Sequence, residues 1–561
     1  MKKPTNVFLL LTIIILSLIP LRSLLQPGMF NSHDGEIHIA RLANFYESLT
    51  QGNIFPRWGG NLNHGLGHPT LMFLYPLPNY FGSLIHFMGF SFVNTVKILF
   101  ASSYVLSGIF MYLLLIVWFG AFPAAIGSLI YLFTPYRFVD FFVRGALPEH
   151  MFFMFAPLAL LTTTIYINKP SYLRLICSSI VLSLCILTHN ASAFFFYPFA
   201  LILFLVKNWS DNPNKIKIFT KIFLPFLFGI IISFFYWFPA LVEGKYTLRY
   251  LIINKQSVVF QLTNLWQLVI PNWGFGDPQF AHGLSVQIGI INLVVFALLI
   301  YFLIRKKLKL NLLILFLIIC YLFAIFLMIK LSKPVWLILP IIYNILYPWR
   351  LLVLLSIISP IFGAIIIQKI FKNKYKFYVL FIFLFGIISL LLTYSYQKPS
   401  GFFLKTDAYF LKEYVGTADL GESSPIWSTL TTDNKSYPTI AILSGNANIK
   451  LIDKLYEYHK YQIDVKTDKA RIIDYTLYFP GWDLFDNQQK ITNQIEFQDP
   501  EFRGLMTFWL PQGKHQIVLK FNNTRVRNYA AIISLLGISL LIVVFLVNKF
   551  YFKKPNLLKS S

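Results

Sequence analysis

The sequence predicts a mainly α membrane protein with about twelve transmembrane helices and an extracytoplasmic β-rich domain before the last of them. Apolar runs of about 20 residues, the length that crosses a bilayer, recur along the chain. Basic residues gather between these runs, as in the cytoplasmic loops of membrane proteins. One long segment, 397–528, is instead polar and contains alternating stretches typical of strands. These three observations together predict the fold class.

The predicted spans follow from the apolar runs. In chain order they are 7–25, 94–118, 121–137, 150–167, 174–190, 193–207, 218–240, 286–304, 310–329, 350–368, 377–396 and 529–548. The first resembles a signal peptide, but no small-residue cleavage site follows it, so we expect an uncleaved anchor. The cysteines at 177, 185 and 320 lie inside apolar runs, and their spacing indicates neither a disulfide framework nor a zinc site.

The distribution of basic residues predicts the topology. The basic segments are the N-terminus, 169–174, 207–221, 305–309, 369–376 and the tail from Lys549. With the N-terminus in the cytoplasm, twelve spans place all of them inside, so a multi-pass protein of the cell membrane with both termini cytoplasmic is expected. The net charge of +25 then reflects loops that face anionic lipid rather than a nucleic-acid partner. The segment 70–90 is apolar too, but counting it as a span would invert this pattern, and Pro76 and Pro78 suit an interfacial or re-entrant helix.

Three domains follow. A transmembrane domain, 1–396, carries the outer loops 26–93, 138–149 and 241–285. The segment 397–528 is expected to form a β-rich, sandwich-like domain, because Ile517, Leu519 and Phe521 share one face of a strand and "FPGWD" (479–483), "DNQQK" (486–490) and "PQGK" (511–514) are typical of turns. The last segment, 529–561, is a final helix with its cytoplasmic tail.

A first cluster of ionisable residues follows the first span, in "NSHDGEIHIARLANFYE" (31–47). On a helix beginning near Asp34, that residue, His38 and Arg41 fall at i, i+4 and i+7 and share a face opposite the apolar stripe. Glu36 is the neighbouring carboxylate and replaces Asp34 if the register differs. The simpler interpretation is an interfacial helix whose charges face water.

A second cluster lies in the next outer loop. Arg137, Asp140 and Arg144 fall at i, i+3 and i+7, and Glu149 follows at the mouth of the next span. Two acidic and basic clusters on one outer face suit an anionic lipid substrate, since arginines bind phosphate bidentately and a carboxylate can deprotonate a hydroxyl. An arginine that snorkels to the membrane edge is the alternative for Arg144.

Four more polar residues lie at the outer ends of spans. His189 and Asn190 interrupt an apolar run in "LTHNAS", Glu243 ends a span, and Arg350 heads one. Because burial of such groups in hydrocarbon is costly, His189 and Asn190 are expected either to face a cavity or to form interhelical hydrogen bonds. For Arg350, snorkelling is the rival interpretation.

Several motifs resemble a known family. "HDGEIHIARLANFYESLTQGNIFPRW", "PYRFVDFFVRGALPEH", "LTHN", "YPWRLL", "YVGTADLGESSPIW" and "YFPGWDLF" look like the bacterial 6-pyruvoyl-tetrahydropterin-synthase-related membrane proteins, near the YfhO-like group, over essentially the whole chain. The order of an acidic residue after span one, an interfacial helix and a second acidic residue in the next outer loop resembles GT-C glycosyltransferases, which use polyprenyl-phosphate sugars. Nothing in the sequence resembles a soluble pterin enzyme.

The resemblance implies a membrane glycosyltransferase that moves a sugar from a polyprenyl-phosphate carrier to a cell-envelope acceptor on the outer face. Asp34 matches the general base of the GT-C pattern, and the second acidic residue is either Asp140 or Glu149. Arg144 and Arg350 are the expected phosphate contacts. The other expected substrate-binding residues are His38, Arg41, His189, Asn190 and Glu243.

The expected partners are the lipid-linked sugar, membrane lipid and a glycan or other envelope acceptor bound by 397–528. Some GT-C enzymes use a divalent metal, so the resemblance leaves such a cofactor open. The main alternative is a non-catalytic scaffold or export component for envelope polysaccharide that keeps the GT-C frame. A transporter would carry ionisable residues deep in its spans, whereas these clusters lie at the outer ends.

Overall fold

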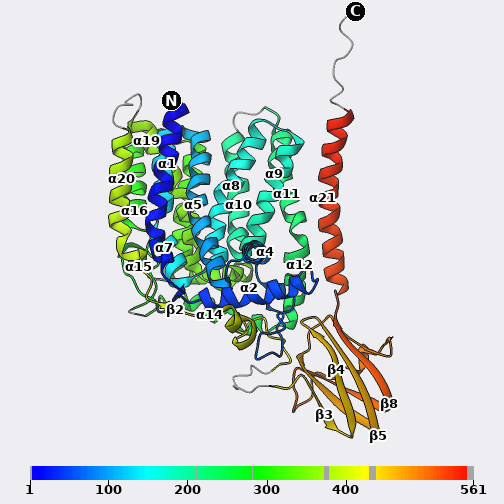
Figure 1. Ribbon diagram of the computed structural model, residues 1–561. Helices are drawn as coiled ribbons and strands as arrows, with labels where there is room; N and C mark the ends of the chain where they lie inside the picture. The colour runs from blue at the N-terminus through cyan, green and yellow to red at the C-terminus, as the bar shows by residue number, and fades with distance from the viewer. Residues whose placement is uncertain (1–2, 210–212, 281, 372–377, 429–436, 552–561) are drawn as a thin grey trace, which may run out of the picture.

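The computed structural model describes residues 3–209, 213–280, 282–371, 378–428 and 437–551. Long helices form a bundle, and a β-sheet domain lies beyond one end of it (Figure 1). The first helix, α1 (Lys3–Leu18), begins at the opposite end of the bundle, where the last helix, α21 (Arg525–Tyr551), finishes (Figure 1). The start of α1 and the end of α21 therefore lie on the same side of the bundle, away from the sheet. Parts of the predicted basic segments 207–221 and 369–376, the first residue of the span 377–396 and most of the tail lie outside the described residues.

Within the described residues, seven helical segments are long and apolar enough to cross a membrane, or nine if two bent pairs each count as one span. The seven are Asn6–Leu25, Phe92–Phe119, Leu147–Asn168, Asn190–Trp209, Pro348–Ile370, Leu380–Gln397 and Arg525–Lys549. The bent pairs are Ala121–Leu132 with Pro135–Arg144 and Lys215–Ile232 with Phe234–Tyr246. Three shorter apolar helices are Tyr172–Thr188, Ile290–Ile304 and Leu312–Met328. Each predicted span thus overlaps one of these segments, while their total of twelve stays a prediction.

The helices of the bundle are, in chain order, α1 with the 3-10 turn η1 (Ile19–Leu25), α5 (Phe92–Phe119), α6 (Ala121–Leu132), α7 (Pro135–Phe138), α8 (Leu147–Asn168), α9 (Tyr172–Thr188), α10 (Asn190–Trp209), α11 (Lys215–Ile232), α12 (Phe234–Glu243), α16 (Ile290–Ile304), α17 (Leu312–Met328), α19 (Leu352–Ile370), α20 (Tyr378–Thr393) and α21. Local chemistry sets several boundaries. The Ser91 side chain accepts the amide hydrogen of Asn94 at the start of α5, and Asn311 caps Ile314 at the start of α17 in the same way. Pro135 cannot extend α6, and the chain bends by 48° there.

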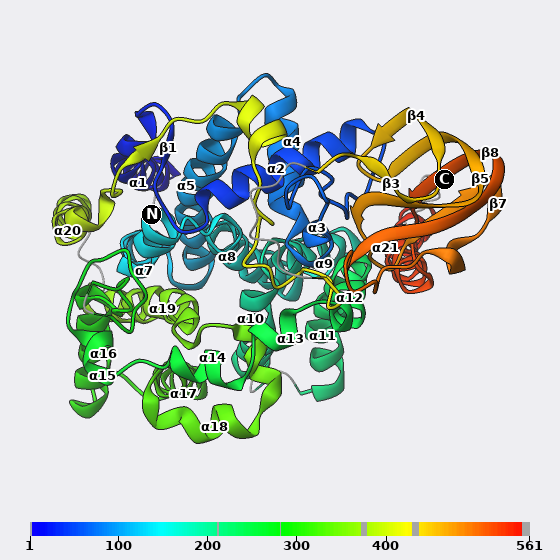
Figure 2. The ribbon, with the colours of Figure 1, turned by 90° about the horizontal axis from the view of Figure 1, so that it is seen from below.

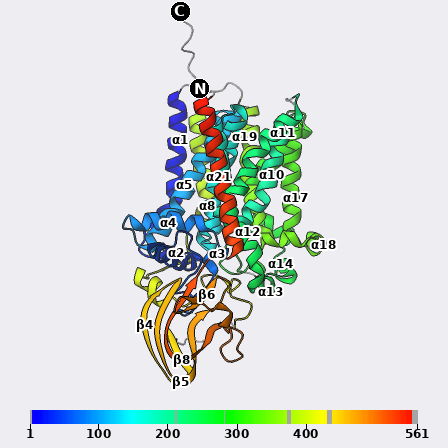
Figure 3. The same ribbon diagram turned by 90° about the vertical axis from the view of Figure 1, so that its right-hand side faces the viewer.

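Three helices of the segment 35–87 do not run along the bundle. α2 (Gly35–Thr50) runs across the end of the bundle that faces the sheet, and the short α3 (Thr70–Phe73) and α4 (Pro76–Phe87) lie beside it (Figures 1 and 3). The segment 70–90 is therefore not a straight span, as predicted, and its placement as an interfacial or a re-entrant helix stays a prediction. The apolar stripe of α2 packs inward through Leu42 and Phe45, which are 2% and 1% exposed.

The segment 138–149 differs from its prediction as an outer loop. It forms a π-helical turn, η2 (Val139–Arg144), followed directly by α8, and all of its residues are buried. Its aromatic side chains fill the bundle, where the Phe141 and Phe142 rings stack 4.3 Å apart. Its charged side chains can be buried because they neutralise one another, as described below.

The remaining part of the bundle end is built from short elements. They are α13 (Arg249–Ile252), α14 (Lys255–Phe260), α15 (Leu265–Val269), α18 (Lys333–Ile338) and the 3-10 turns η3 (Gly244–Tyr246), η4 (Lys330–Ser332), η5 (Pro340–Ile345), η6 (Pro348–Leu351) and η8 (Tyr394–Gln397). Thr263, between α14 and α15, joins this region to the end of α17, because its amide donates to the carbonyl of Met328 over 2.9 Å. The segment 241–285 thus contains short helical elements up to Val269, and its described residues after Val269 lie outside helices and strands.

The C-terminal domain contains one antiparallel sheet of six strands. The strands are β3 (Ile440–Ser444), β4 (Ala447–Leu455), β5 (Tyr458–Leu477), β6 (Trp482–Asp486), β7 (Gln489–Lys490) and β8 (Leu505–Phe521). Their order is β3-β5-β8-β6-β7, and β4 also pairs with β5. A single sheet replaces the predicted sandwich, because the long β5 bonds β8 along one edge and both β3 and β4 along the other.

The strand pattern and two of the predicted turns are confirmed. Ile517, Leu519 and Phe521 are 0%, 0% and 7% exposed on one face of β8, and turns lie at 480–481 and 487–488. The turn predicted at 511–514 is wrong. β8 instead continues through Pro511. Proline has no amide hydrogen to donate, and it is tolerated here because the pairing with β5 shifts register at this point, between Val465 and Lys469.

Two junctions hold the sheet domain and the bundle together. A short pair of strands, β1 (Met29–Phe30) and β2 (Phe402–Phe403), joins the first outer loop to the segment after α20. Trp58 of the first loop enters the core of the sheet domain, where its ring lies 5.5 Å from that of Trp482 and 5.3 Å from that of Phe521. The first outer loop therefore belongs to both parts of the structure.

Candidate functional site

The start of α2 is fixed against η2 by backbone hydrogen bonds. The amides of His33 and Asp34 donate to the carbonyls of Val143 and Arg144 over 3.0 and 2.8 Å. Gly145 permits this approach, since a Cβ there would lie 2.2 Å from the Ser32 Oγ and its φ is +62°. The two clusters recognised in the sequence consequently meet at the end of the bundle.

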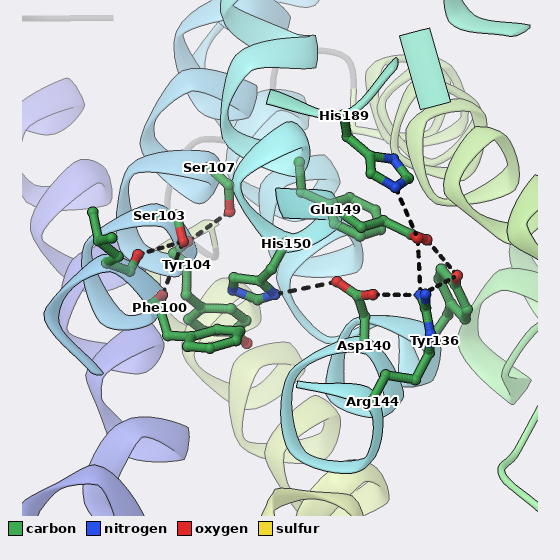
Figure 4. A network of polar contacts seen from close by, with 12 residues as sticks. Phe100, Ser103, Tyr104, Ser107, Tyr136, Asp140, Arg144, Glu149, His150 and His189 are labelled. Carbon is green, nitrogen blue, oxygen red and sulfur yellow. Dashed lines mark hydrogen bonds and ion pairs between the residues drawn. The ribbon is translucent and has the colours of Figure 1, made fainter. Parts of the chain in front are cut away.

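Glu149, in the first turn of α8, is the centre of a buried ion network. Its Oε2 accepts hydrogen bonds from Arg144 Nη1 and Arg350 Nε, each at 2.8 Å. Its Oε1 accepts one from the Tyr136 hydroxyl at 2.5 Å, and Figure 4 shows Arg144 and Tyr136 beside this carboxylate. His189 Nε2 lies 3.8 Å from the same Oε2. Two guanidinium groups from distant segments are thus held at one carboxylate.

Asp140 binds the deeper side of the same network. Its Oδ1 accepts a hydrogen bond from Arg144 Nη1 over 2.8 Å, and its Oδ2 lies 3.7 Å from His150 Nδ1 (Figure 4). Arg137 does not join this group through any hydrogen bond within the described residues. Its guanidinium lies instead among the rings of Tyr104, Tyr131 and Phe153, 4.7–4.8 Å from their centroids.

A cavity of about 120 Å³ opens above this network, between η2, α2 and α8. Its polar lining residues are Asp34, His38, Arg41, Tyr75, Arg144, Glu149, His189, Tyr347, Arg350, Asp419 and Glu422. Six of the predicted site residues besides Asp34 therefore line one hollow: His38, Arg41, Arg144, Glu149, His189 and Arg350. Below, we refer to it as the Asp34 cavity.

The carboxylate of Asp34 is available inside this cavity. It is half-buried, and among the described residues no hydrogen bond or ion pair engages its side chain. Arg144 and Arg350, by contrast, are held by Glu149, and Arg144 also lies 5.0 Å from the Trp349 ring. The cavity therefore combines an unpaired carboxylate with guanidinium groups whose positions are fixed.

His38 and Arg41 line the cavity from α2. Arg41 Nη1 lies 3.2 Å from His38 Nδ1, and Arg41 Nη2 donates to the carbonyl of Ala418 over 2.6 Å. Burial, with the nearby charges of Arg41 and Arg144, holds the pKa of His38 well below its usual value. The imidazole is therefore neutral at physiological pH, and its Nδ1 accepts a hydrogen bond from Arg41. This contact does not neutralise the positive charge of the guanidinium group.

The segment 414–426 forms a strap that closes the cavity on its outer side. In Figure 2 this segment, coloured yellow, passes in front of α2. The Asp419 carboxylate accepts the amide hydrogens of Gly421 and Ser423 over 2.7 and 3.2 Å, which shapes the turn. Burial and the neighbouring Asp419 raise the pKa of Glu422 to about 7. The strap thus adds two acidic groups to the lining.

Sequence reasoning missed these two acids and Tyr75. The signal was present, because "YVGTADLGESSPIW" is among the family-like motifs, but its distance along the chain gave no reason to place it at this site. Tyr75 lies between α3 and α4, and its ring is 4.8 Å from that of His189. Burial raises its pKa, so it is present as a neutral phenol that can hydrogen-bond a ligand.

Four predicted site residues do not line the cavity. Glu36 pairs with Lys405 over 2.6 Å and accepts from the Tyr409 hydroxyl, Asp140 lies behind Arg144, and Asn190 begins α10 outside the lining. Glu243 instead binds Arg527 of α21 over 2.8 Å and fastens α12 to the last helix. A local pattern cannot distinguish these structural pairs from cavity residues.

The carboxylates and histidines do not fit a metal site. Within the described parts of the chain, no three His, Cys, Asp or Glu side chains come together closely enough to hold an ion. Glu149, the most central carboxylate, already receives two guanidinium groups and a phenol. The open question of a divalent cofactor therefore receives no support from this geometry.

A protein-family model matches residues 71–398, which is more than half of the chain. Its description is 6-pyruvoyl-tetrahydropterin synthase related domain, membrane protein. The chain belongs to this family. The match includes the residues of the Glu149 network but begins after Asp34 and α2. Membership identifies a membrane protein and assigns no reaction. Among curated proteins, no relative matches the sequence.

Several solved structures are similar to this chain at low identity. The oligosaccharyltransferase of Archaeoglobus fulgidus is 12% identical, with a TM-score of 0.45, and the alignment covers 76% of this chain and 61% of that one. The mycobacterial arabinofuranosyltransferase AftD is 14% identical (TM-score 0.45; 70% of this chain, 28% of that one). ArnT of Cupriavidus metallidurans, solved with undecaprenyl phosphate, is 11% identical (TM-score 0.42; 70% and 65%). The chain spans less than two thirds of each of these proteins.

Proposed function

We propose that this protein is an inverting membrane glycosyltransferase that moves a sugar from a polyprenyl-phosphate carrier to a hydroxyl of a cell-envelope acceptor on the outer face. The Asp34 cavity carries the proposal, because it sets an unpaired carboxylate among the guanidinium groups of Arg41, Arg144 and Arg350. α2, which lines the cavity, runs across the end of the bundle that faces the sheet domain (Figure 1), and under the predicted topology this is the outer end.

The phosphate of the carrier is assigned to the guanidinium side of the cavity. Arg350 uses Nε for Glu149 and Nη1 for the carbonyl of Ile345, and Arg144 uses Nη1 for Glu149 and Asp140. These contacts fix both planes before a ligand arrives, which lowers the ordering cost of binding. Arginines held in this way stabilise a departing phosphate by charge and by hydrogen bonds.

Asp34 is assigned the role of general base. The acceptor oxygen attacks the anomeric carbon, the bond from that carbon to the phosphate oxygen breaks, and Asp34 takes the hydroxyl proton. The polyprenyl phosphate leaves with the electron pair of the broken bond. Attack from the side opposite the phosphate inverts the anomeric centre. Asp34 suits this task, since it is half-buried, precedes the first residue of α2 and lines the same cavity as Arg350.

The size of the cavity limits what it encloses. About 120 Å³ is smaller than the roughly 300–1,000 Å³ of pockets that enclose whole small-molecule ligands. The cavity therefore holds the phosphate and the reacting carbon, while the polyprenyl tail extends along the bundle beside α8 and α19 and the acceptor approaches from the sheet domain. The cell membrane is the location that this assignment requires.

The test is transfer in membranes that contain the full-length protein, with labelled polyprenyl-phosphate hexose and pentose donors. Asp34→Asn removes the base with little change in volume, and we expect at least about a hundredfold loss of transfer. Asp468→Asn, an exposed carboxylate in β5, is the matched control and retains the wild-type rate. Undiminished transfer by Asp34→Asn removes that residue from the role. Wild-type protein that binds undecaprenyl phosphate, seen as thermal stabilisation, yet never transfers sugar supports the scaffold instead.

A further inference from the structure

A second, larger cavity lies where α2, the first outer loop and the sheet domain meet. Its volume is about 400 Å³, within the range of pockets that enclose small-molecule ligands. We call it the seam cavity and define it by Gln51, Asn61, Lys412, Lys454, Tyr456 and His459 of its lining. None of these residues takes part in the proposed transfer.

Segments from four parts of the chain fix this cavity. Gln51, just after α2, accepts the amide hydrogen of Tyr456 through its Oε1 over 2.8 Å, which joins the helix to the turn between β4 and β5. Figure 2 shows this end of α2 next to β4. Asn61 donates its side-chain amide hydrogen to the carbonyl of Leu411. Hydrogen bonds between distant segments of the chain thus hold the walls of the cavity in place.

Glycine residues of the first loop shape its wall. A Cβ at Gly60 would lie 2.4 Å from the Tyr456 ring, so glycine there lets the ring lie directly on the backbone. Gly67 has φ +76°, and a Cβ there would lie 2.3 Å from the Trp58 indole nitrogen. Gly65, in the "GLGHP" turn, faces open space. Gly60 and Gly67 therefore leave room for the two aromatic side chains directly against the backbone.

His459 presents an oriented imidazole to the cavity. Its Nδ1 lies 3.0 Å from Asp474 Oδ2, and the same oxygen accepts from the Tyr461 hydroxyl over 2.6 Å. Asp474 is fully buried in the sheet, so this carboxylate fixes the ring and its tautomer. No hydrogen bond from the described residues engages Nε2, which leaves that nitrogen for a ligand.

The lining identifies the ligand chemistry. Side-chain amides, two lysines, Glu47 and an imidazole offer both donors and acceptors, and Tyr456 and Trp58 add aromatic surface. An apolar ligand would leave these polar groups unpaired. A nucleotide or free phosphate would find the two lysine charges opposed by Glu47. A polyhydroxylated ring with apolar C–H faces satisfies both kinds of surface.

We propose that the seam cavity is a saccharide-binding site. The binding itself stands without the proposed transfer, and it would serve a scaffold equally well. Under the proposed transfer it becomes a distal subsite for an oligosaccharide acceptor. α2 carries both cavities, with Arg41 in one and Glu47 in the other, and six helical residues correspond to about 9 Å along the axis. The two cavities therefore lie less than two helical turns apart along α2.

The test is ligand-observed saturation-transfer NMR on the full-length protein in detergent, with maltotetraose, chitotetraose and tetragalacturonate at millimolar concentration. We expect saturation transfer to at least one of the three. Lys454→Ala, an exposed residue of β4, and Tyr456→Ala weaken that binding at least about tenfold, because each removes a side chain from the lining. A His459→Asn variant, whose side chain ends near the position of Nδ1 and has no group at the position of Nε2, weakens the binding in the same direction.

Two controls separate this proposal from the proposed function. Lys450→Ala removes a second exposed lysine of β4 that does not line the cavity, and it retains wild-type binding. Asp34→Asn, which disables the proposed base, also retains saccharide binding. Absence of saturation transfer from all three tetrasaccharides overturns the proposal. So does binding that Lys454→Ala and Tyr456→Ala leave unchanged, since the sugar would then lie elsewhere.

Discussion

Glu149 and Arg350 are 201 residues apart in the chain, yet the carboxylate Oε2 of one lies 2.8 Å from Nε of the other. Both side chains are buried, and Arg144 binds the same oxygen at the same distance. The contact joins the start of α8 to the turn before α19. It closes the floor of the Asp34 cavity and sets the orientation of both guanidinium groups.

Removal of this carboxylate is expected to destabilise the protein. Glu149→Gln keeps the volume of the side chain but leaves two buried guanidinium groups without their shared anion, and breaking a buried pair in this way costs about 3–5 kcal/mol. The measurement is thermal unfolding in detergent. Glu36→Gln is the matched control, because its partly exposed pair with Lys405 contributes about 1 kcal/mol or less. Equal melting temperatures for the two variants would contradict the central role of Glu149.

The Glu243–Arg527 pair is expected to couple α12 to the base of α21. Arg527 Nε donates to Glu243 Oε2 over 2.8 Å, and Thr524 donates to Oε1 over 2.5 Å. Glu243→Gln and Arg527→Met each leave one buried group without its partner, so each should lower the stability by several kcal/mol. The double variant should lose less than the sum of the two, which a double-mutant cycle of unfolding measures. Additive losses would show that the two residues act independently.

The stability should fall as the pH rises through neutrality, in part because of Glu457. Burial raises the pKa of Glu457, in the β4–β5 turn, from 4.5 to about 7. The folded state then binds this proton more tightly than the unfolded chain. The stabilisation is fully present below about pH 4.5 and is lost as the pH rises through 7, up to about 3 kcal/mol. Melting temperatures between pH 5 and 8 should decrease for the wild type.

Glu457→Gln should flatten that decrease, since the amide does not titrate. Glu501→Gln, an exposed residue of the same domain, should keep the wild-type slope. A Glu457→Gln profile that remains parallel to the wild-type profile would assign the pH dependence to other groups. Glu422, whose pKa is also raised to about 7, is the next to replace.

The predicted topology can be tested with two exposed lysines. In a variant without the three native cysteines, Lys466→Cys places a thiol on the sheet domain and Lys307→Cys places one in the basic loop after α16. A membrane-impermeant maleimide should label the first in intact cells and the second only after permeabilisation, because the positive-inside rule puts the basic loop in the cytoplasm. The reverse labelling would invert the protein and place the Asp34 cavity inside the cell.

Much of the fold could be predicted from local patterns. Apolar runs marked the spanning helices, alternation marked β8, and Pro76 and Pro78 marked a segment that lies outside the bundle axis. The face shared by Asp34, His38 and Arg41 follows from helical spacing alone, and all three line one cavity. These features depend on residues within a few turns of each other, where periodicity decides the outcome.

The failures share a physical cause. The segment 138–149 resembled a loop because it is charged, but its charges pair with one another and with Arg350, so it packs inside the bundle. Glu36 and Glu243 resembled site residues, but each is neutralised by a cation, Lys405 or Arg527, far away in the chain. A charge next to a membrane span has the same local pattern whether it faces water, a ligand or a partner.

The sequence by itself determined the membrane class, the approximate positions of the apolar helices, the strand pattern of 515–521, and the two clusters of ionisable residues. Only the tertiary structure decided which charges face the Asp34 cavity, that Asp419 and Glu422 join them, and that the sheet domain forms a second cavity with α2. The reason is that secondary structure follows from neighbouring residues, whereas a site depends on which distant side chains packing brings within hydrogen-bond distance.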